Sequence, residues 1–235
     1  MKLHLKFDLH THSRFSADGV SEPEDMVEEA RKKKLSGFAI TDHNTCACVD
    51  YFLQHGFMRT DGKPVDDFLI IPGQEISTSE GHLLALGVRL PDLKGIPPEE
   101  AISLVHQSGG IAVPAHPYDF FRSGIREALM DVLPIDAVEV FNAATTLKRY
   151  NRQAFEYAQR MKLPMVAGSD AHHARAIGTA YTILEPEEFT LEGVLASIKK
   201  AHRVEQRYLT AKETIKKTWS NIFRLKRKKK THHKK

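Results

Sequence analysis

The sequence predicts an α/β fold built like a barrel, in one large domain, and two observations carry that prediction. The chain has 235 residues, a length at which α/β barrels commonly form a single domain. Along the chain, short apolar runs typical of buried strands repeatedly end at Asp, Glu or His, and helical patterns follow them. Because the carboxyl ends of barrel strands meet at one rim, these polar side chains are expected to lie together.

The first expected strand lies at the start of the sequence and ends at two histidines. Apolar Leu5, Phe7 and Leu9 alternate with polar residues up to His10 and His12. Side chains two residues apart in a strand point to the same face, so both imidazoles can bind one metal ion. Histidines at this spacing also occur without a metal, as hydrogen-bonded or solvated side chains, so further ligands are needed.

Helices and strands are expected to alternate along the rest of the chain. Ser21 and Glu24 have the spacing of a capping box and predict a helix that ends at about residue 34. A Pro-Pro pair and a Gly-Gly pair bound a second helix near residues 98–107. Glu75 is expected just after a strand, and His82 at the start of an antiparallel neighbour. The other helices are expected at 146–162 and 191–202, and strands at 38–41, 68–71, 82–87, 111–115, 137–141, 165–168 and 178–184.

The polar residues at or near these strand ends form a candidate metal-binding set of six histidines and three carboxylates. Imidazole and carboxylate ligands without cysteine suit Zn²⁺, Mn²⁺ or Fe²⁺. The set is larger than one ion can use, so two or three divalent ions are expected. A carboxylate can bridge two ions through its two oxygens, whereas an imidazole serves one. The set consists of His10, His12, Asp18, His43, Glu75, His82, His116, Asp170 and His172.

Most of these residues fall in five short motifs, which lie between residues 7 and 182. The motifs are Asp8-Leu9-His10-Thr11-His12-Ser13, Thr41-Asp42-His43-Asn44, Gly73-Gln74-Glu75, Ala115-His116-Pro117 and Gly168-Ser169-Asp170-Ala171-His172. In identity and order they resemble the motifs of the PHP family, named for polymerase and histidinol phosphatase. The resemblance implies a distorted (β/α)₇ TIM-like barrel over residues 1–205, with a trinuclear metal site and metal-dependent phosphoesterase activity.

The resemblance also implies how the ligands are shared and which substrates are hydrolysed. It implies one metal on His10, His12, Glu75 and Asp170, a second on Glu75, His82 and His116, and a third on Asp18, His43 and His172. Many family members have a histidine where this chain has Asp18, and the aspartate is similar to a branch with nucleotide phosphatases and an exoribonuclease. The implied reaction is attack of metal-bound hydroxide on a phosphate monoester, a nucleotide or an oligonucleotide end. Histidinol phosphatase is the alternative within the family.

Arginines near the ligands are candidates to hold the phosphate, because a guanidinium can bind phosphate through two hydrogen bonds. Arg14 and Arg175 flank ligand motifs, and Arg122 is a third candidate; each could instead be a surface arginine. Asp42 could orient an imidazole or cap a helix. No Gly-rich phosphate loop is present in the sequence, which disfavours a nucleoside triphosphatase. Two further residues could contact substrate or only pack at the rim: Asn142 and Tyr118.

Charge is distributed unevenly along the chain. The net charge is +4, yet residues 212–235 hold eleven Lys or Arg against one acid, so the preceding part of the chain is acidic. An acidic body suits divalent cations, and the basic segment suits RNA, DNA or an anionic membrane surface. Residues 206–235 are expected to form a C-terminal helix and tail, with Trp219 on the apolar face. Docking of that helix on the barrel, with a disordered end, is the alternative.

The remaining features point to a reducing compartment. Cys46 and Cys48 have no second pair with which to form a thiolate zinc site, and are expected to be reduced and structural. With no leader pattern and no apolar run of membrane-spanning length, the protein is expected in the cytoplasm. The sequence does not indicate an oligomeric state. A second class of function is a non-enzymatic nucleic-acid-binding or accessory protein with structural metals, in which the basic tail supplies the affinity.

Overall fold

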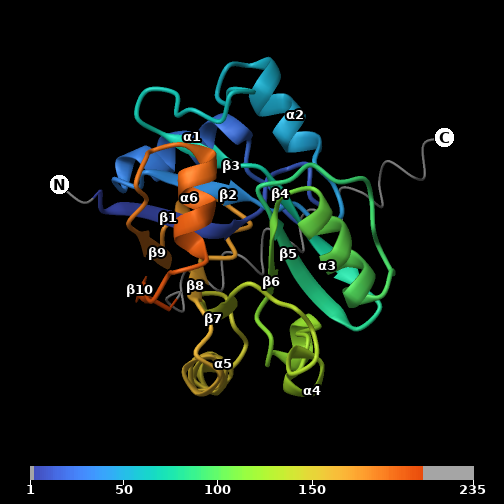
Figure 1. Cartoon of the computed structure of the whole chain (residues 1–235). Helices are drawn as coiled ribbons and strands as arrows, with labels where there is room; N and C mark the ends of the chain where they lie inside the picture. Colours follow the sequence, from blue (N-terminus) through green and yellow to red (C-terminus); the bar gives the residue numbers. More distant parts are fainter. Residues whose placement is uncertain (1–2, 209–235) are drawn as a thin grey trace.

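The computed structural model describes residues 3–208, and Figure 1 shows strands through the middle of the molecule with helices around them. The C-terminal helix and basic tail predicted for residues 206–235 lie, except for residues 206–208, outside the described part of the chain. The helical elements are α1 (Pro23–Lys32), α2 (Ala47–Gln54), α3 (Pro98–Gln107), η1 (Phe120–Arg122), α4 (Glu127–Met130), α5 (Lys148–Met161), η2 (Ala174–Ala176) and α6 (Leu191–Ile198). The strands are β1 (Leu5–Thr11), β2 (Gly37–Ile40), β3 (Leu69–Ile71), β4 (Gly73–Thr78), β5 (Gly81–Leu86), β6 (Ile111–Pro114), β7 (Val138–Asn142), β8 (Met165–Gly168), β9 (Tyr181–Leu184) and β10 (Arg203–Glu205).

The described strands form three sheets. The first has the order β10-β9-β1-β2-β3, the second is β4-β5-β6, and the third is β7-β8. Strands β1, β2 and β3 run parallel, as do β7 and β8, whereas β4, β5 and β6 are antiparallel. The α/β class predicted from the sequence is therefore confirmed, but the described strands do not form one closed barrel sheet.

Backbone hydrogen bonds join neighbouring sheets at their ends. The Asp170 amide donates to the His10 carbonyl oxygen at 2.8 Å, which links the segment after β8 to β1. The Glu75 amide lies 3.2 Å from the carbonyl oxygen of Thr41, which links β4 to the end of β2. The Asp136 amide, just before β7, donates to the Ala112 carbonyl oxygen of β6 at 3.0 Å. These bonds bring the ends of β1, β2, β4 and β8 to one region of the molecule.

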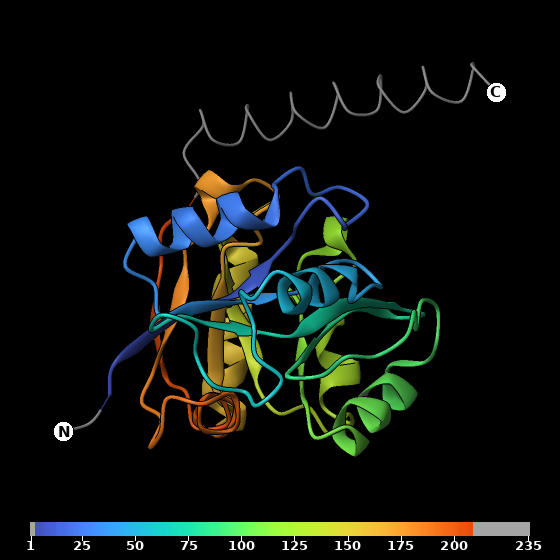
Figure 2. The same ribbon diagram turned by 90° about the horizontal axis from the view of Figure 1, so that it is seen from above.

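Apolar faces of the helices pack against the sheets. Met26 of α1 and Phe52 of α2 share a buried cluster with Phe38 of β2, and both rings and the methionine are fully buried. Tyr157 of α5 packs in a second cluster with Val140 of β7. Figure 2 shows the same arrangement from above, with the helices around the outside of the strands. Burial of these side chains drives the packing that fixes the strand ends relative to one another.

Two local predictions are wrong. Helix α1 has Glu22 as its N-cap and Pro23 as its first residue, with no side-chain cap, so the expected capping box of Ser21 is absent. Proline suits the first helical position because its φ is fixed and it needs no amide partner there. Glu75 does not follow the end of a strand at residues 68–71 but lies inside β4, which pairs with β5 through a separate antiparallel ladder.

Membrane insertion through a helix finds no support in the described residues. Among residues 3–208, no helix combines the length and the apolar character that crossing a bilayer requires.

Candidate metal centre

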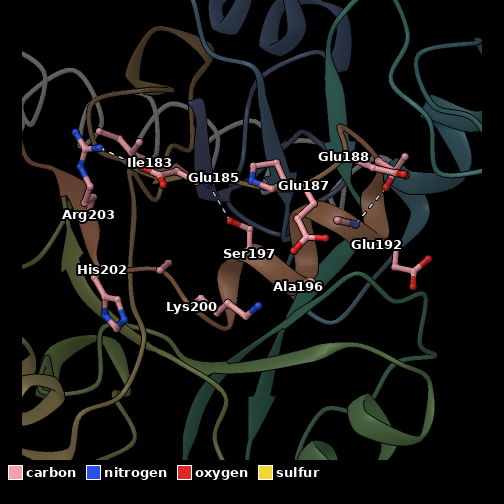
Figure 3. A pocket seen from close by; sticks show the side chains of 14 residues that line it. Ile183, Glu185, Glu187, Glu188, Glu192, Ala196, Ser197, Lys200, His202 and Arg203 are labelled. Carbon is pink, nitrogen blue, oxygen red and sulfur yellow. Dashed lines mark hydrogen bonds and ion pairs between the residues drawn. The ribbon is translucent and has the colours of Figure 1, made fainter. Parts of the chain in front are cut away.

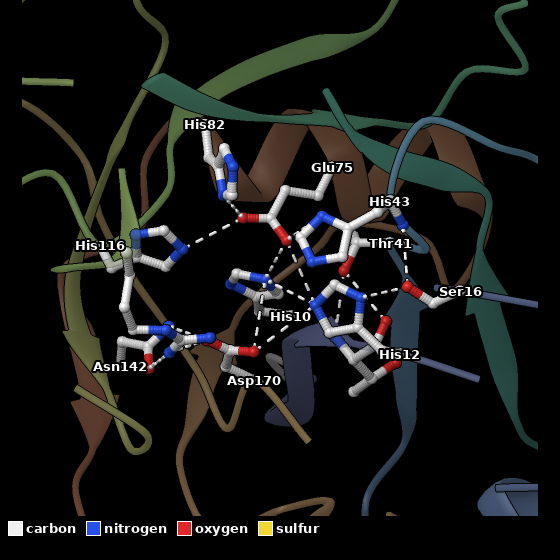
Figure 4. A network of polar contacts seen from close by, with 12 residues as sticks. His10, His12, Ser16, Thr41, His43, Glu75, His82, His116, Asn142 and Asp170 are labelled. Carbon is white, nitrogen blue, oxygen red and sulfur yellow. Dashed lines mark hydrogen bonds and ion pairs between the residues drawn. The ribbon is translucent and has the colours of Figure 1, made fainter. Parts of the chain in front are cut away.

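All nine candidate ligands lie in one cluster at the strand ends, and Figure 4 shows most of them around Glu75. His10 belongs to β1, Glu75 to β4 and His82 to the start of β5. The others lie in the segments that follow β1, β2, β6 and β8. Within the described residues, ligand atoms close enough to share an ion occur in four groups: His12, Asp18, His43 and His172; His10, His116 and Asp170; His10, His12 and Glu75; and His43, Glu75 and His82.

Glu75 lies at the middle of this cluster and is almost fully buried. Both of its carboxylate oxygens face imidazole nitrogens. The distances from Oε2 are 3.2 Å to His10 Nε2, 3.3 Å to His12 Nε2 and 3.2 Å to His43 Nδ1, and those from Oε1 are 2.8 Å to His82 Nδ1 and 3.1 Å to His116 Nε2. A carboxylate that faces nitrogens on both oxygens is suited to bridge two ions.

Two further aspartates extend the cluster in different directions. Asp170 Oδ1 lies 3.5 Å from His12 Nε2, and Asp170 Oδ2 forms an ion pair with Arg122. Asp18 Oδ2 lies 2.8 Å from His172 Nε2 and 3.5 Å from His43 Nε2. The loop that carries Asp18 thus brings a carboxylate to the histidines farther from Arg122.

The hydrogen bonds of His172 show why the donor set fits metal ions. Its Nδ1 lies 2.9 Å from the carbonyl oxygen of Asp170, so that nitrogen carries the proton and donates. In the neutral ring, Nε2 then directs a lone pair at Asp18 Oδ2, only 2.8 Å away. Positive charge is needed to make that approach favourable, and a divalent cation supplies it.

His10 repeats this pattern at the other side of the cluster. Its Nδ1 faces Glu139 Oε1 at 2.9 Å, so Nδ1 carries the proton, and Nε2 faces Glu75 Oε2 at 3.2 Å. Such a carboxylate behind a ligating histidine fixes the ring and its tautomer. The residues present therefore fit metal ions.

Electrostatics keep the carboxylates of the cluster ionised. Burial disfavours the charged form of Glu75, but His43 and His10 outweigh it and hold its pKa well below the usual range. Burial likewise opposes ionisation of Asp18, and its contacts with His172 and His43 lower its pKa well below the ordinary value. Ionised carboxylates packed beside several imidazole nitrogens are the setting that attracts divalent cations.

Sequence reasoning missed Glu139, which supports two ligands. It is almost fully buried, and besides His10 its Oε2 accepts from the His116 amide at 2.6 Å and from Asn142 Nδ2 at 3.1 Å. The signal was present: a glutamate inside the apolar run at residues 137–141 can be buried only with partners. Asn142 also donates to Asp170 Oδ2 at 3.1 Å, so it lies beside the ligands and is more than a packing residue.

Backbone conformation is strained at two ligand positions. His116 has φ of +34° and Asp170 has φ of +52°, in the left-handed region that residues other than glycine rarely adopt. Each such residue raises the free energy of the fold by about 1–3 kcal/mol. Gly168 allows the end of β8 to lie close to His10 of β1, because a Cβ on residue 168 would lie 2.3 Å from the Cβ of His10.

The residues expected to act on substrate are placed differently from one another. Arg122, the third candidate, has its guanidinium at Asp170 and 3.4 Å from Asn142 Oδ1. Arg14 instead pairs with Glu22 at the surface and lies over the Phe15 ring, and within residues 3–208 it makes no ion pair or hydrogen bond with the ligands.

Two more of these expectations are changed by the structure. Arg175 lies exposed in η2, and within residues 3–208 its side chain makes no contact with the cluster. Asp42 neither caps a helix nor bonds an imidazole; it accepts from the amide and hydroxyl of Ser13, both at 2.6 Å, and so anchors the loop after β1. Tyr118 donates to Glu127 at 2.6 Å.

A hollow lies on another part of the molecule. Figure 3 shows a depression of about 880 Å³ whose lining includes Glu185, Glu188, Lys200 and Arg203. It shares no residue with the cluster, and the polar groups around it form ordinary surface contacts such as that between Arg203 and Glu185 at 3.4 Å. The chemistry therefore centres on the cluster and not on this hollow.

Comparison with known proteins agrees with the motifs. Residues 148–202, which include α5, β8 and the last two ligands, match a family described as PHP-associated. The chain is 33% identical over 149 residues to the uncharacterised protein MJ1587 of Methanocaldococcus jannaschii, which covers 59% of this chain and 82% of that protein. It is also 34% identical over 86 residues to the 5′-3′ exoribonuclease Rnm of Salmonella typhimurium, covering 35% of this chain and 27% of that one.

The fold is similar to solved structures as well. A two-domain protein of Bacteroides vulgatus, which contains a predicted PHP-like metal-dependent phosphoesterase, superposes with a TM-score of 0.68 at 19% identity. The match covers 94% of this chain and 70% of that one. With the five motifs in order, the PHP-associated match and this shared fold, the chain belongs to the PHP family.

Proposed function

We propose that the protein is a metal-dependent phosphoesterase, built on a distorted (β/α)₇ barrel, that hydrolyses a phosphate monoester in a nucleotide or at an oligonucleotide end. The observation that carries the proposal is the cluster of nine nitrogen and oxygen ligands with the Arg122 guanidinium at its edge. Divalent ions held by these ligands would supply positive charge to activate water, and the guanidinium would help to hold a phosphate.

The proposed cofactors are two or three divalent ions, Mn²⁺, Zn²⁺ or Fe²⁺. Bound ions of this kind lower the pKa of water and neutralise phosphoryl oxygens. Glu75 would bridge ions, and Glu139 would keep His10 in the tautomer that leaves Nε2 free to bind. The ligands proposed to hold the ions are His10, His12, Asp18, His43, Glu75, His82, His116, Asp170 and His172.

Arg122 is proposed to bind the phosphate in place of Arg14 and Arg175. Burial opposes the charge of its guanidinium, but Asp170 outweighs it and raises the pKa further above its usual range, so the group stays charged. Its side chain is 20% exposed, which leaves it accessible to a ligand. A guanidinium fixed at one side by a carboxylate and an amide oxygen presents its remaining N–H groups in a defined direction.

Nucleotides and nucleic-acid ends are the proposed substrates for two reasons. Asp18 stands where many family members have histidine, and the Salmonella exoribonuclease is among the relatives. The eleven Lys or Arg of residues 212–235 would attract a polyanion. Histidinol phosphatase activity is the alternative within the family, and a substrate panel separates it.

The test combines metal analysis with turnover. Purified protein is analysed for bound metal and then assayed with Mn²⁺ on an aryl phosphate, nucleoside monophosphates, histidinol phosphate and short RNA and DNA. His12→Ala should abolish turnover while His202→Ala, at an exposed histidine outside the cluster, leaves it unchanged. A folded wild-type protein that binds no metal and hydrolyses none of these compounds would contradict the proposal.

The second candidate is a non-enzymatic nucleic-acid-binding protein, favoured by the basic segment. It predicts that deletion of residues 212–235 abolishes salt-sensitive binding to RNA or DNA, and that His10→Ala changes only stability. If His10→Ala removes turnover while circular dichroism shows an intact fold, this candidate fails.

A further inference from the structure

Two adjacent phenylalanines are exposed beside the candidate metal centre. Phe120 and Phe121 belong to η1, and their side chains are 64% and 69% exposed. Within residues 3–208, no other phenylalanine or tyrosine is exposed. Single exposed apolar residues are common on proteins, but two neighbouring aromatic rings at a site mark a surface that a ligand can cover.

The chain ties these rings directly to the metal-binding cluster. Arg122, the next residue, forms the ion pair with Asp170. The carbonyl oxygen of Ser123 accepts from the His82 amide at 2.8 Å. Consecutive Cα atoms are only about 3.8 Å apart, so Phe121 starts one residue away from the guanidinium proposed to bind phosphate.

The turn that carries the rings is held in place by a buried aspartate. Asp119 is fully buried and accepts from the Phe121 amide at 3.2 Å and from the Thr146 amide at 2.6 Å. It also accepts from the Thr145 hydroxyl at 3.2 Å. A binding surface whose backbone is fixed in advance loses less conformational entropy when the ligand arrives.

The two rings have different surroundings. The guanidinium of Arg126 lies 4.8 Å from the centre of the Phe120 ring. The rings of Phe120 and Phe121 are 5.7 Å apart and nearly perpendicular, at 76°. In the described part of the chain no cation covers the Phe121 ring. Phe120 thus supports Phe121 from the side and leaves it available for stacking.

We propose that Phe121 stacks against the base of a nucleotide, or of an unpaired strand end, whose phosphate lies at Arg122. This inference rests on the proposed phosphoesterase function and narrows its substrate to compounds that carry a base. Aromatic side chains bind bases of any sequence because every base has a flat π face. Arg122 and Arg126 add the positive charge that matches a phosphate next to that base.

The experiment compares a nucleotide with a phosphate ester that has no base. For Phe121→Leu, KM for adenosine monophosphate should rise roughly 5- to 100-fold, the range expected for loss of one base-aromatic stack, with kcat little changed. KM for ribose 5-phosphate should stay within about twofold, because stacking is absent there. Phe121→Trp, which keeps an aromatic ring, should have a KM for the nucleotide close to that of wild type. Val132→Ala is the control for loss of an exposed apolar side chain.

The outcomes separate this inference from the function on which it rests. Equal changes in KM for both compounds, or none for either, overturn the stacking role while phosphoesterase activity stands. If wild-type protein hydrolyses neither compound, calorimetry of adenosine monophosphate binding to wild type and Phe121→Leu tests stacking alone. The proposed function fails only if the protein also hydrolyses no other compound of the substrate panel. A shift from dimer to monomer in Phe121→Leu with unchanged nucleotide affinity would make this face an interface between copies and overturn the inference.

Discussion

Replacement of Glu139 by glutamine tests how the buried carboxylate supports the metal ligands. Glutamine keeps the size of the side chain but replaces one acceptor oxygen with an NH₂ donor. At the native position, one oxygen accepts from His10 Nδ1 at 2.9 Å, and the other accepts from the His116 amide at 2.6 Å and from Asn142 at 3.1 Å. Because the second position faces two donors, the new NH₂ group is expected to face His10.

The expected effect follows from the tautomer of His10. With an NH₂ donor in front of it, Nδ1 becomes the acceptor and the proton moves to Nε2, the nitrogen that faces Glu75. A protonated Nε2 cannot bind a metal ion. Changes to groups behind metal-ligating histidines typically lower metal affinity or activity by about 10- to 100-fold. Loss of the charge-assisted hydrogen bond should also lower the free energy of unfolding by about 1–3 kcal/mol.

Two measurements check this prediction. Metal affinity is measured by competition with a fluorescent chelator, and stability by urea unfolding in EDTA, where no metal contributes. Glu156→Gln is the matched control, since that glutamate is exposed on α5 and its one ion pair within the described residues is with Arg152, at 3.9 Å. A Glu139→Gln protein with wild-type metal affinity would refute the reasoning, whatever its stability.

Four other outcomes are expected. Gly168→Ala should lower the free energy of unfolding by about 1–3 kcal/mol, measured in urea, because its Cβ would collide with His10. Thr190→Ala should lower the free energy of unfolding by about 1 kcal/mol in the same measurement, since the Thr190 hydroxyl at the start of α6 accepts from the Gly193 amide at 3.1 Å. Burial raises the pKa of the Cys48 thiol well above its usual range, so iodoacetamide should label Cys48 far more slowly in folded than in urea-unfolded protein, as mass spectrometry would show. Removal of metal by EDTA should lower Tm in calorimetry, because an ion present at 100 times its Kd stabilises the fold by about 2.7 kcal/mol.

Most of the ligands were predictable from sequence because they lie at or shortly after the point where an apolar strand pattern stops. His10, His43 and Asp170 follow runs of buried residues, and the α/β pattern alone indicates that such positions share one edge. Glu75 was expected at the right edge for a partly wrong reason. It belongs to the antiparallel strand β4, and nothing in its short flanking pattern distinguishes that strand from a loop after β3.

Side-chain direction could not be predicted in the same way. Arg14, Arg122 and Arg175 all lie near ligand motifs in the sequence, yet only Arg122 turns toward the cluster. The difference depends on tertiary partners, such as Glu22 for Arg14 and Asp170 for Arg122. Glu139 was missed because its role depends on two backbone segments that approach it from elsewhere in the fold.

The contact between β1 and the segment after β8 has a consequence for biosynthesis. The Asp8 carboxylate accepts from the Ser169 amide at 2.8 Å, across 161 residues of sequence, next to ligands on both segments. A nascent chain therefore exposes its first histidines long before the segment after β8 exists. At ribosomal speeds of about 5–20 residues per second, this interval lasts roughly 10–30 s. With the proposed ligand set, complete metal loading would follow synthesis of β8, and a chain arrested before β8 would lack the ligands Asp170 and His172.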